Sequence, residues 1–169
     1  MRAMVLSAPS APLLMTERAD PVPGDGEVRI KVSACGVCRT DVHVIDGELP
    51  NIHYPIIPGH EIVGRINLMG RGVTGHRIGD RVGIPWLGYT CGTCRYCRRG
   101  MENLCDHPLF TGYTRDGGFA THVIADARYT FALGETGDDV STAPLLCAGL
   151  IGWRSLVMAG DAERLGIYG

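Results

Sequence analysis

The sequence predicts a mainly β fold with few helices, rolled up as a barrel or a sandwich. Glycine accounts for 24 of the 169 residues, roughly double its average share, and glycine supplies the tight turns that join short strands. Residues 27–34 alternate between apolar and polar side chains, with one face formed by Val28, Ile30, Val32 and Ala34. This period of two is typical of a half-buried strand.

The other elements of the β region are expected to be short. Residues 4–6 are expected to pair with residues 27–34 across the Pro- and Gly-containing turn at 21–26. Residues 38–46 predict a short helix that ends at Gly47, because glycine commonly terminates helices. A proline-containing loop follows, and the remaining strands are expected at 61–68, 81–84, 119–125 and 128–131.

The character of the sequence changes near residue 134. After a polar linker at 134–139, Thr142 is expected to cap a helix that has Pro144 in its first turn. That helix is expected to run to Met158, and residues 165–168 predict a hydrophobic strand just before Gly169. A helix and then a strand that ends on glycine indicate the entry to a βαβ unit. We therefore divide the chain into a domain at 1–138 and the start of a second domain at 139–169.

Composition and charge exclude several classes of protein. The formal net charge is -2, which argues against nucleic acid and anionic membrane surfaces as partners. Pro9 and Pro12 interrupt the N-terminal stretch, unlike a secretory signal, and no apolar run reaches the roughly 18 residues of a membrane span. The expected location is cytoplasmic. There the seven cysteines would be reduced, so clustered cysteines predict metal binding rather than disulfides.

Four cysteines lie close together in the sequence and predict a structural zinc site. They follow the pattern C-x2-C-x2-C-x7-C at Cys91, Cys94, Cys97 and Cys105. Four thiolates form a closed tetrahedral site for Zn²⁺, with no position left for a substrate. An iron–sulfur cluster is the main alternative, and surface thiols or a disulfide pair are others. The arginines of this loop are expected to form a solvated rim rather than a nucleic-acid surface.

Three cysteines remain, and the residues alone leave their roles open. Cys35 and Cys38 form a C-x2-C pair, which suggests a redox motif, but no thioredoxin-like βαβ pattern surrounds it. Cys35 lies on the predicted strand and is expected to be a small buried residue. His60, beside Glu61, is on its own more typical of a histidine that is hydrogen-bonded at the end of a strand.

Taken in order, the motifs resemble those of zinc-dependent medium-chain alcohol dehydrogenases. Gly59-His60-Glu61, followed by Gly64, Gly70 and Val73, is similar to the signature of this family. Residues 38–43 resemble its first catalytic segment, residues 91–105 its structural zinc lobe, and Cys147 its third catalytic ligand. The resemblance covers essentially the whole chain. It implies a GroES-like, partly open β-barrel at 1–138, and the first helix and strand of a Rossmann domain at 139–169.

The resemblance implies a catalytic zinc held by Cys38, His60 and Cys147, with Glu61 as a transient ligand. Two thiolates, one imidazole and an open position are the ligand set of an alcohol dehydrogenase. With the structural zinc, two zinc ions per chain are expected. The implied reaction is the reversible oxidation of an alcohol to an aldehyde or ketone, with hydride transfer to NAD(P).

Four residues near Cys38 acquire roles from the same resemblance. Thr40 would accept the proton of the substrate hydroxyl, and His43 would pass it to solvent through the cofactor ribose. Arg39 would contact a cofactor phosphate, and Asp41 would support His60 as a hydrogen-bond acceptor. From the residues alone, Thr40 also fits an ordinary place near the start of a helix, Asp41 fits the positive end of the helix dipole, and His43 fits the surface.

The same family places Leu49, Trp86 and Leu87 where the substrate pocket is lined. Large apolar side chains there would leave a small pocket, which favours short or slender alcohols and aldehydes. The alternative for Trp86 is an ordinary core position.

The chain is expected to be truncated just where the cofactor domain begins, so we expect it to be inactive alone. The full-length protein is expected to form a homo-oligomer. One alternative is a stand-alone, non-catalytic zinc-binding module with a chaperonin-10-like barrel. Another is a zinc ribbon that binds nucleic acid, against which the net charge argues.

Overall fold

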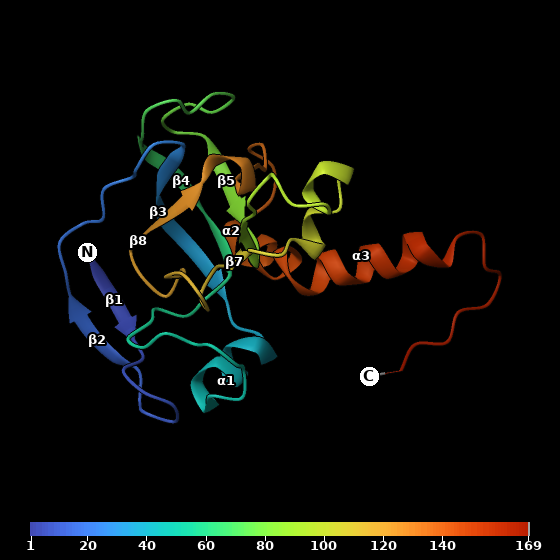
Figure 1. Cartoon of the computed structure of the whole chain (residues 1–169), viewed down its shortest axis with the longest axis horizontal. Coiled ribbons are helices and arrows are strands. Elements are labelled where there is room, and N and C mark those ends of the chain that lie inside the picture. Colours follow the sequence, from blue (N-terminus) through green and yellow to red (C-terminus); the bar gives the residue numbers. More distant parts are fainter. Residues whose placement is uncertain (169) are drawn as a thin grey trace.

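The computed structural model of the protein describes residues 1–168, and its regular structure is mainly β, as predicted (Figure 1). The strands are β1 (Arg2–Val5), β2 (Leu14–Glu17), β3 (Glu27–Gly36), β4 (Glu61–Met69), β5 (Arg81–Ile84), β6 (Leu87–Tyr89), β7 (Leu109–Phe110), β8 (His122–Asp126) and β9 (Phe131–Ala132). The helices are α1 (Arg39–Asp46), α2 (Asp139–Thr142) and α3 (Ala148–Ala159), with 3-10 turns η1 (Cys97–Arg99), η2 (Glu102–Leu104), η3 (Ala127–Tyr129) and η4 (Ala143–Leu146).

A five-stranded antiparallel sheet, in the order β8-β3-β4-β5-β9, forms the centre of the fold. The predicted alternation of β3 is confirmed, because Val28 and Ile30 are buried whereas Lys31 and Ser33 are exposed. The main apolar core consists of Val28, Ile30, Ile62, Ile66, Val82, Ile84, Val123 and Ala125. Burial of these side chains is the dominant favourable contribution to folding.

The glycine inside β4 is explained by the close approach of β3. Gly64 lies opposite Val32. A Cβ atom at Gly64 would lie 2.3 Å from the Lys31 carbonyl oxygen and 2.6 Å from Ile30 Cγ2. Both separations are shorter than van der Waals contact, so only glycine allows the strands to lie this close.

The N-terminal strand has a different partner from the predicted one. β1 pairs with β2, where Ala3 lies opposite Thr16, and it does not pair with β3. Both edges of β3 are already hydrogen-bonded, to β4 on one side and to β8 on the other. Leu6 instead forms an isolated bridge with Ile56.

The two strands predicted after the cysteine loop are shorter than expected. β8 begins only at His122, because the Phe119 carbonyl accepts a hydrogen bond from Met4 N at 2.8 Å, outside the central sheet. In the segment predicted as a strand at 128–131, residues 128 and 129 belong to η3, and only Phe131 lies in a strand, β9. The Asp126 carboxylate caps this turn by accepting a hydrogen bond from Arg128 N.

The predicted C-terminal helix is broken into three pieces. Asp138, not Thr142, is the first N-cap: its carboxylate accepts a hydrogen bond from Ser141 N at 2.9 Å. The chain then forms η4, in which Ala143 and Leu146 are buried. Three residues per turn place both on one face. The helical geometry is interrupted at Cys147, and α3 ends before Gly160 as expected.

The helix α3 projects away from the sheet (Figure 1). Its apolar side chains are largely exposed, including Ile151 at 63% and Trp153 at 67%. The strand predicted at 165–168 is absent from the part of the chain that the structure describes, since no partner strand lies beside it to accept its hydrogen bonds. Gly169, which completes that prediction, lies outside the described residues.

Among residues 1–168, no single helix is long and apolar enough to cross a membrane. The bent pair Asp139–Leu146 and Ala148–Ala159 passes this test only when its two parts are taken together, by length and composition alone.

Candidate metal centres

The four cysteines at 91–105 converge in a small cysteine lobe beside β6. The turns η1 and η2 fold the chain back, so that the four sulfur atoms lie within 4.8 Å of one another. Cys94 Sγ lies 3.5 Å from Cys97 Sγ, and Cys105 Sγ lies 3.6 Å from Cys91 Sγ. The sulfurs are therefore not bonded to each other, because a disulfide requires about 2.05 Å.

Backbone N–H groups lower the pKa of two thiols of the cysteine lobe, Cys91 and Cys94, whereas desolvation raises the pKa of the Cys97 thiol to about 11. The Cys94 N–H donates to Cys91 Sγ at 3.4 Å, and the His107 N–H donates to Cys105 Sγ at 3.3 Å. Hydrogen bonds from the backbone of Thr93 and Cys94 lower the pKa of the Cys91 thiol to about 6. Cys91 is therefore prepared to act as a metal ligand at neutral pH.

The spacing of these sulfurs fits a single tetrahedral zinc ion. Two sulfurs on one zinc, each about 2.3 Å from it, lie about 3.8 Å apart, close to the separations of 3.5 and 3.6 Å in the lobe. An iron–sulfur cluster places several atoms between its ligands, and it would need a wider opening than this. The donor set and its geometry therefore fit structural zinc.

The second group of possible metal ligands, which we call the Cys38 group, consists of Cys38, His60, Glu61 and Cys147, whose ligand atoms lie within 4.8 Å of one another. Three separate parts of the chain contribute to it: the N-cap of α1, the first residue of β4 with the histidine before it, and the break before α3. Cys38 Sγ lies 3.2 Å from His60 Nε2 and 3.9 Å from Cys147 Sγ. The sulfur–sulfur distance again matches the roughly 3.8 Å of two thiolates on one zinc.

Asp41 holds two of these segments together. Its side chain is buried, and one carboxylate oxygen accepts a hydrogen bond from Cys38 N at 2.9 Å. The other oxygen accepts from Gly59 N at 3.1 Å and lies 3.4 Å from His60 Nδ1. A carboxylate on Nδ1 fixes the imidazole so that Nε2 faces the ligand position.

The buried Glu61 and the half-buried Cys35 both lie beside the Cys38 group, but only Glu61 contributes a ligand atom to it. Burial raises the pKa of the Glu61 carboxyl, although the neighbouring His60 lowers it. The absence of a Cβ atom at Gly36 leaves room for this carboxylate, since such an atom would lie 1.9 Å from Glu61 Oε2. Burial also raises the pKa of the Cys35 thiol to about 12, so that it remains a neutral thiol.

The helix α1 carries the residues to which the family resemblance gives roles in proton transfer. Cys38 caps the helix by accepting from Thr40 N at 3.3 Å, and Gly47 ends it in the left-handed conformation, as predicted. Thr40 and His43 are half-buried and three residues apart, so they share one face of the helix. His43 Nδ1 is paired with the Glu48 carboxylate, a partner that the sequence motifs do not indicate. Arg39 is exposed in the first turn.

Of the three predicted pocket residues, the structure places two together. Trp86 contacts the edge of the His60 ring, with a centroid separation of 5.0 Å, and it belongs to the same apolar cluster as Leu49. Leu87 lies elsewhere, in a surface hollow that Cys97 and Arg128 also line. Trp86 lies in the bend just before β6, whereas Leu87 is the first residue of that strand, and the two side chains enter different surroundings.

Sequence reasoning missed the aromatic residues that support Trp86. Phe110 and Tyr113 stack on it with centroid separations of 5.1 and 5.4 Å. Both lie more than 20 residues further along the chain, in the segment that returns from the cysteine lobe. No local pattern in the sequence indicates this contact.

Comparison with known proteins agrees with this architecture. The sequence profile of the alcohol dehydrogenase GroES-like domain matches residues 24–135. The "Probable alcohol dehydrogenase AdhA" of Mycobacterium tuberculosis is 46% identical over 167 residues, which cover 95% of this chain and 48% of the relative.

Solved structures of alcohol dehydrogenases are also similar to this chain. A cobalt- and zinc-bound thermostable alcohol dehydrogenase from Pyrobaculum aerophilum is similar with a TM-score of 0.85 and 32% identity, over 95% of this chain and 49% of that one. An Escherichia coli alcohol dehydrogenase complexed with cofactor NADH gives a TM-score of 0.78 and 32% identity, over 86% and 42% of the two chains. The chain spans about half the length of the curated relatives it matches, and it belongs to the alcohol dehydrogenase family as a GroES-like domain.

Proposed function

We propose that the chain is the zinc-binding catalytic domain of an NAD(P)-dependent alcohol dehydrogenase, which interconverts an alcohol and an aldehyde or ketone. The observation that carries this proposal is the convergence of Cys38, His60 and Cys147, whose ligand atoms lie within 4.8 Å of one another although Cys147 is 109 residues from Cys38. Two thiolates and one imidazole leave the fourth position of a tetrahedral ion open.

A zinc ion held there supplies a Lewis acid that stabilises negative charge on a substrate oxygen. The residues of α1 then handle the proton. We propose that the Thr40 hydroxyl accepts the hydrogen bond of the substrate hydroxyl and that His43 passes the proton towards solvent. Their half-buried positions on one face of α1 support this assignment. Arg39, exposed in the first turn, is proposed to contact a cofactor phosphate.

Glu61 is proposed as an alternative ligand of the same ion. Its carboxylate is buried and belongs to the Cys38 group. A buried carboxylate next to an open coordination position can occupy that position when no substrate is bound. Such an exchange would leave Cys38, His60 and Cys147 in place.

We propose that residues 1–138 form the catalytic domain and that residues 139–169 begin the cofactor domain. The exposed apolar side chains of α3, such as Trp153 and Ile151, support this division, because apolar patches of this kind are normally covered. For the whole enzyme we also propose NAD or NADP as the cofactor, a cytoplasmic location and a homo-oligomeric assembly.

The proposed substrates are short or slender alcohols and aldehydes. Trp86 lies against the His60 ring, and Phe110 and Tyr113 stack on it, so the wall beside the proposed zinc is a rigid aromatic surface. Leu49 extends this apolar wall. A small apolar site discriminates against bulky substrates by exclusion.

Cobalt substitution tests the open coordination position. With Co²⁺ in place of zinc, we expect two sets of absorption bands, one from the cysteine lobe and one from the Cys38 group. Imidazole should shift only the second set, because four thiolates leave no free position on the first ion. The matched control is Cys147→Ser, which should remove the imidazole-sensitive bands and leave the others unchanged.

If no set of bands responds to imidazole, the result would instead support the non-catalytic zinc module and contradict the proposed function. Alcohol-dependent reduction of NAD or NADP, measured on this chain joined to a nicotinamide-binding domain, then tests the reaction itself.

A further inference from the structure

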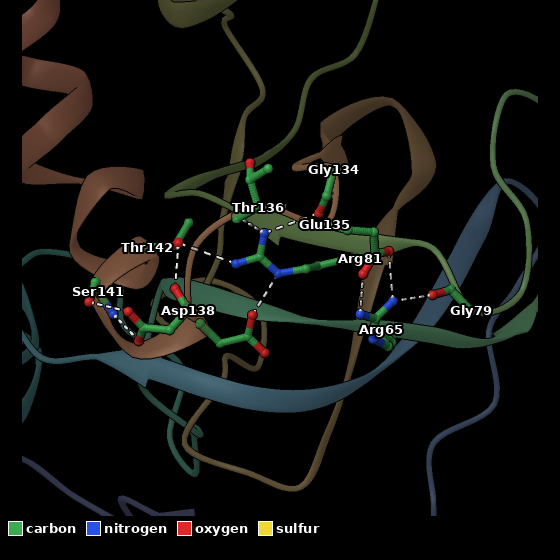
Figure 2. A network of polar contacts seen from close by, with 10 residues as sticks. Arg65, Gly79, Arg81, Gly134, Glu135, Thr136, Asp138, Ser141 and Thr142 are labelled. Atoms are coloured by element: carbon green, nitrogen blue, oxygen red, sulfur yellow. Dashed lines mark hydrogen bonds and ion pairs between the residues drawn. The ribbon is translucent and has the colours of Figure 1, made fainter.

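A buried arginine binds the segment that leads to Cys147. Arg81, the first residue of β5, is only 5% exposed. Its guanidinium group donates to Asp139 Oδ1 at 2.6 Å and to Thr142 Oγ1 at 3.2 Å. It also donates to the Gly134 and Thr136 carbonyl oxygens, at 3.1 and 3.0 Å. Figure 2 shows the guanidinium reaching into this segment, with the groups it binds around it.

Every hydrogen-bond partner of this guanidinium group lies between residues 134 and 142. The segment is also fixed internally. Thr142 Oγ1 donates to the Asp138 carbonyl oxygen at 2.6 Å, and the Asp138 carboxylate accepts from Ser141 N at 2.9 Å. Arg81 is therefore the buried side chain of the sheet that holds the connection between β9 and η4, which Arg65 contacts only at the surface, through Glu135.

The turn η4 connects this fixed segment to Cys147 and is itself packed on the sheet. Ala143 and Leu146 pack against Val63 of β4. A Cβ atom at Gly83 would lie 2.8 Å from Leu146 Cδ2, so this side chain sits directly on β5. Cys147 is the next residue, and its N–H donates to the Pro144 carbonyl oxygen at 3.3 Å.

Beyond Cys147 the chain has little contact with the sheet. The side chains of α3 include no buried residue. The position of the Cys147 sulfur, 3.9 Å from Cys38 Sγ, is thus determined by the segment that precedes it. A metal ligand held only from one side depends on the rigidity of that side.

We propose that Arg81 and Asp139 act as a positioning clamp that holds Cys147 within reach of Cys38 and His60. The inference rests on the proposed function, since it requires Cys147 to be a metal ligand. It assigns a specific task to an ion pair between a buried arginine and a half-buried aspartate, because the desolvation cost of such a pair makes it a poor source of stability alone. Arg81 touches neither the metal nor the substrate, so it is a positioning residue and not a catalytic one.

The test is Arg81→Met in the full chain loaded with Co²⁺. We expect the affinity of the Cys38 group for the metal to fall about 10- to 100-fold, the usual effect of removing a residue that orients metal ligands. The imidazole-insensitive bands of the cysteine lobe should be unchanged. A general loss of stability would not weaken one site selectively.

The matched control is Arg65→Met. Arg65 lies directly opposite Arg81 in the β4–β5 pair and forms an exposed ion pair with Glu135 at 2.6 Å. Figure 2 shows this second arginine beside the first, bound to Gly79 and Glu135 instead of to Thr142. This variant should retain the metal affinity of both sites.

Two milder variants decide the matter if Arg81→Met does not fold. Arg81→Lys and Asp139→Asn each keep part of the clamp, and both should weaken metal binding at the Cys38 group by a smaller factor. If the parent chain binds two metal ions and both variants keep its metal affinity at the Cys38 group, the proposed clamp is overturned. A parent chain without imidazole-sensitive bands would instead contradict the proposed function.

Discussion

Replacing Cys97 with serine is expected to release the zinc ion of the cysteine lobe and to leave residues 91–105 without ordered structure. Within this segment Cys105 alone is buried, so no apolar core holds the lobe together. Structural zinc contributes about 10–16 kcal/mol of apparent binding free energy to small domains, and the lobe has no other source of this size. Amide hydrogen exchange should show the loss as near-complete exchange of these residues.

The central sheet should be unaffected by the same substitution. Its core consists of residues such as Val28, Ile62 and Val82, none of which belongs to the lobe. Cys35→Ala is the control, because Cys35 is a half-buried thiol that lies outside both ligand groups. Protection of residues 91–105 that persists in Cys97→Ser would show that the zinc does not order the lobe.

Replacing Asp41 with asparagine should weaken metal binding at the Cys38 group about 10- to 100-fold. The amide keeps one oxygen acceptor, but the carboxylate serves Cys38 N, Gly59 N and the His60 ring together. At least one of these groups must then face an NH₂ group or lose its partner, which costs about 1–3 kcal/mol when it is buried. Competition with a chromophoric chelator measures the affinity, with the cysteine lobe as an internal reference.

Asp46→Asn provides the matched control for Asp41→Asn. Asp46 is the last residue of the same helix, and its side chain is exposed. The two variants remove the same charge from α1, but only one removes hydrogen bonds to the metal-binding segments. Equal metal affinities in the two variants would contradict the role assigned to Asp41.

Local patterns in the sequence predicted the parts of the fold that depend on local interactions. The alternation of residues 27–34 predicted β3, and residues 38–46, followed by Gly47, predicted α1. The spacing of the cysteines at 91–105 predicted a compact group of four sulfurs. In each case the residues that interact lie within about fifteen positions of one another.

The parts that were predicted wrongly depend on contacts between distant segments. Residues 4–6 were expected to pair with β3, but both edges of β3 are occupied, by β4 and by β8. The helix expected from Thr142 is broken at Cys147, because Leu146 packs on the sheet while α3 leaves it. The Arg81 network, which the sequence did not indicate at all, spans 58 residues to Asp139. A propensity scale describes single residues and cannot indicate these pairings.

The number of zinc ions per chain, measured before and after a mild chelator, tests the central claim most directly. Two separate ligand groups predict two zinc ions, and the chelator should remove only the one in the Cys38 group, whose open position makes it accessible. The zinc of the cysteine lobe should remain. A folded, reduced chain that contains no zinc would contradict the assignment of both centres.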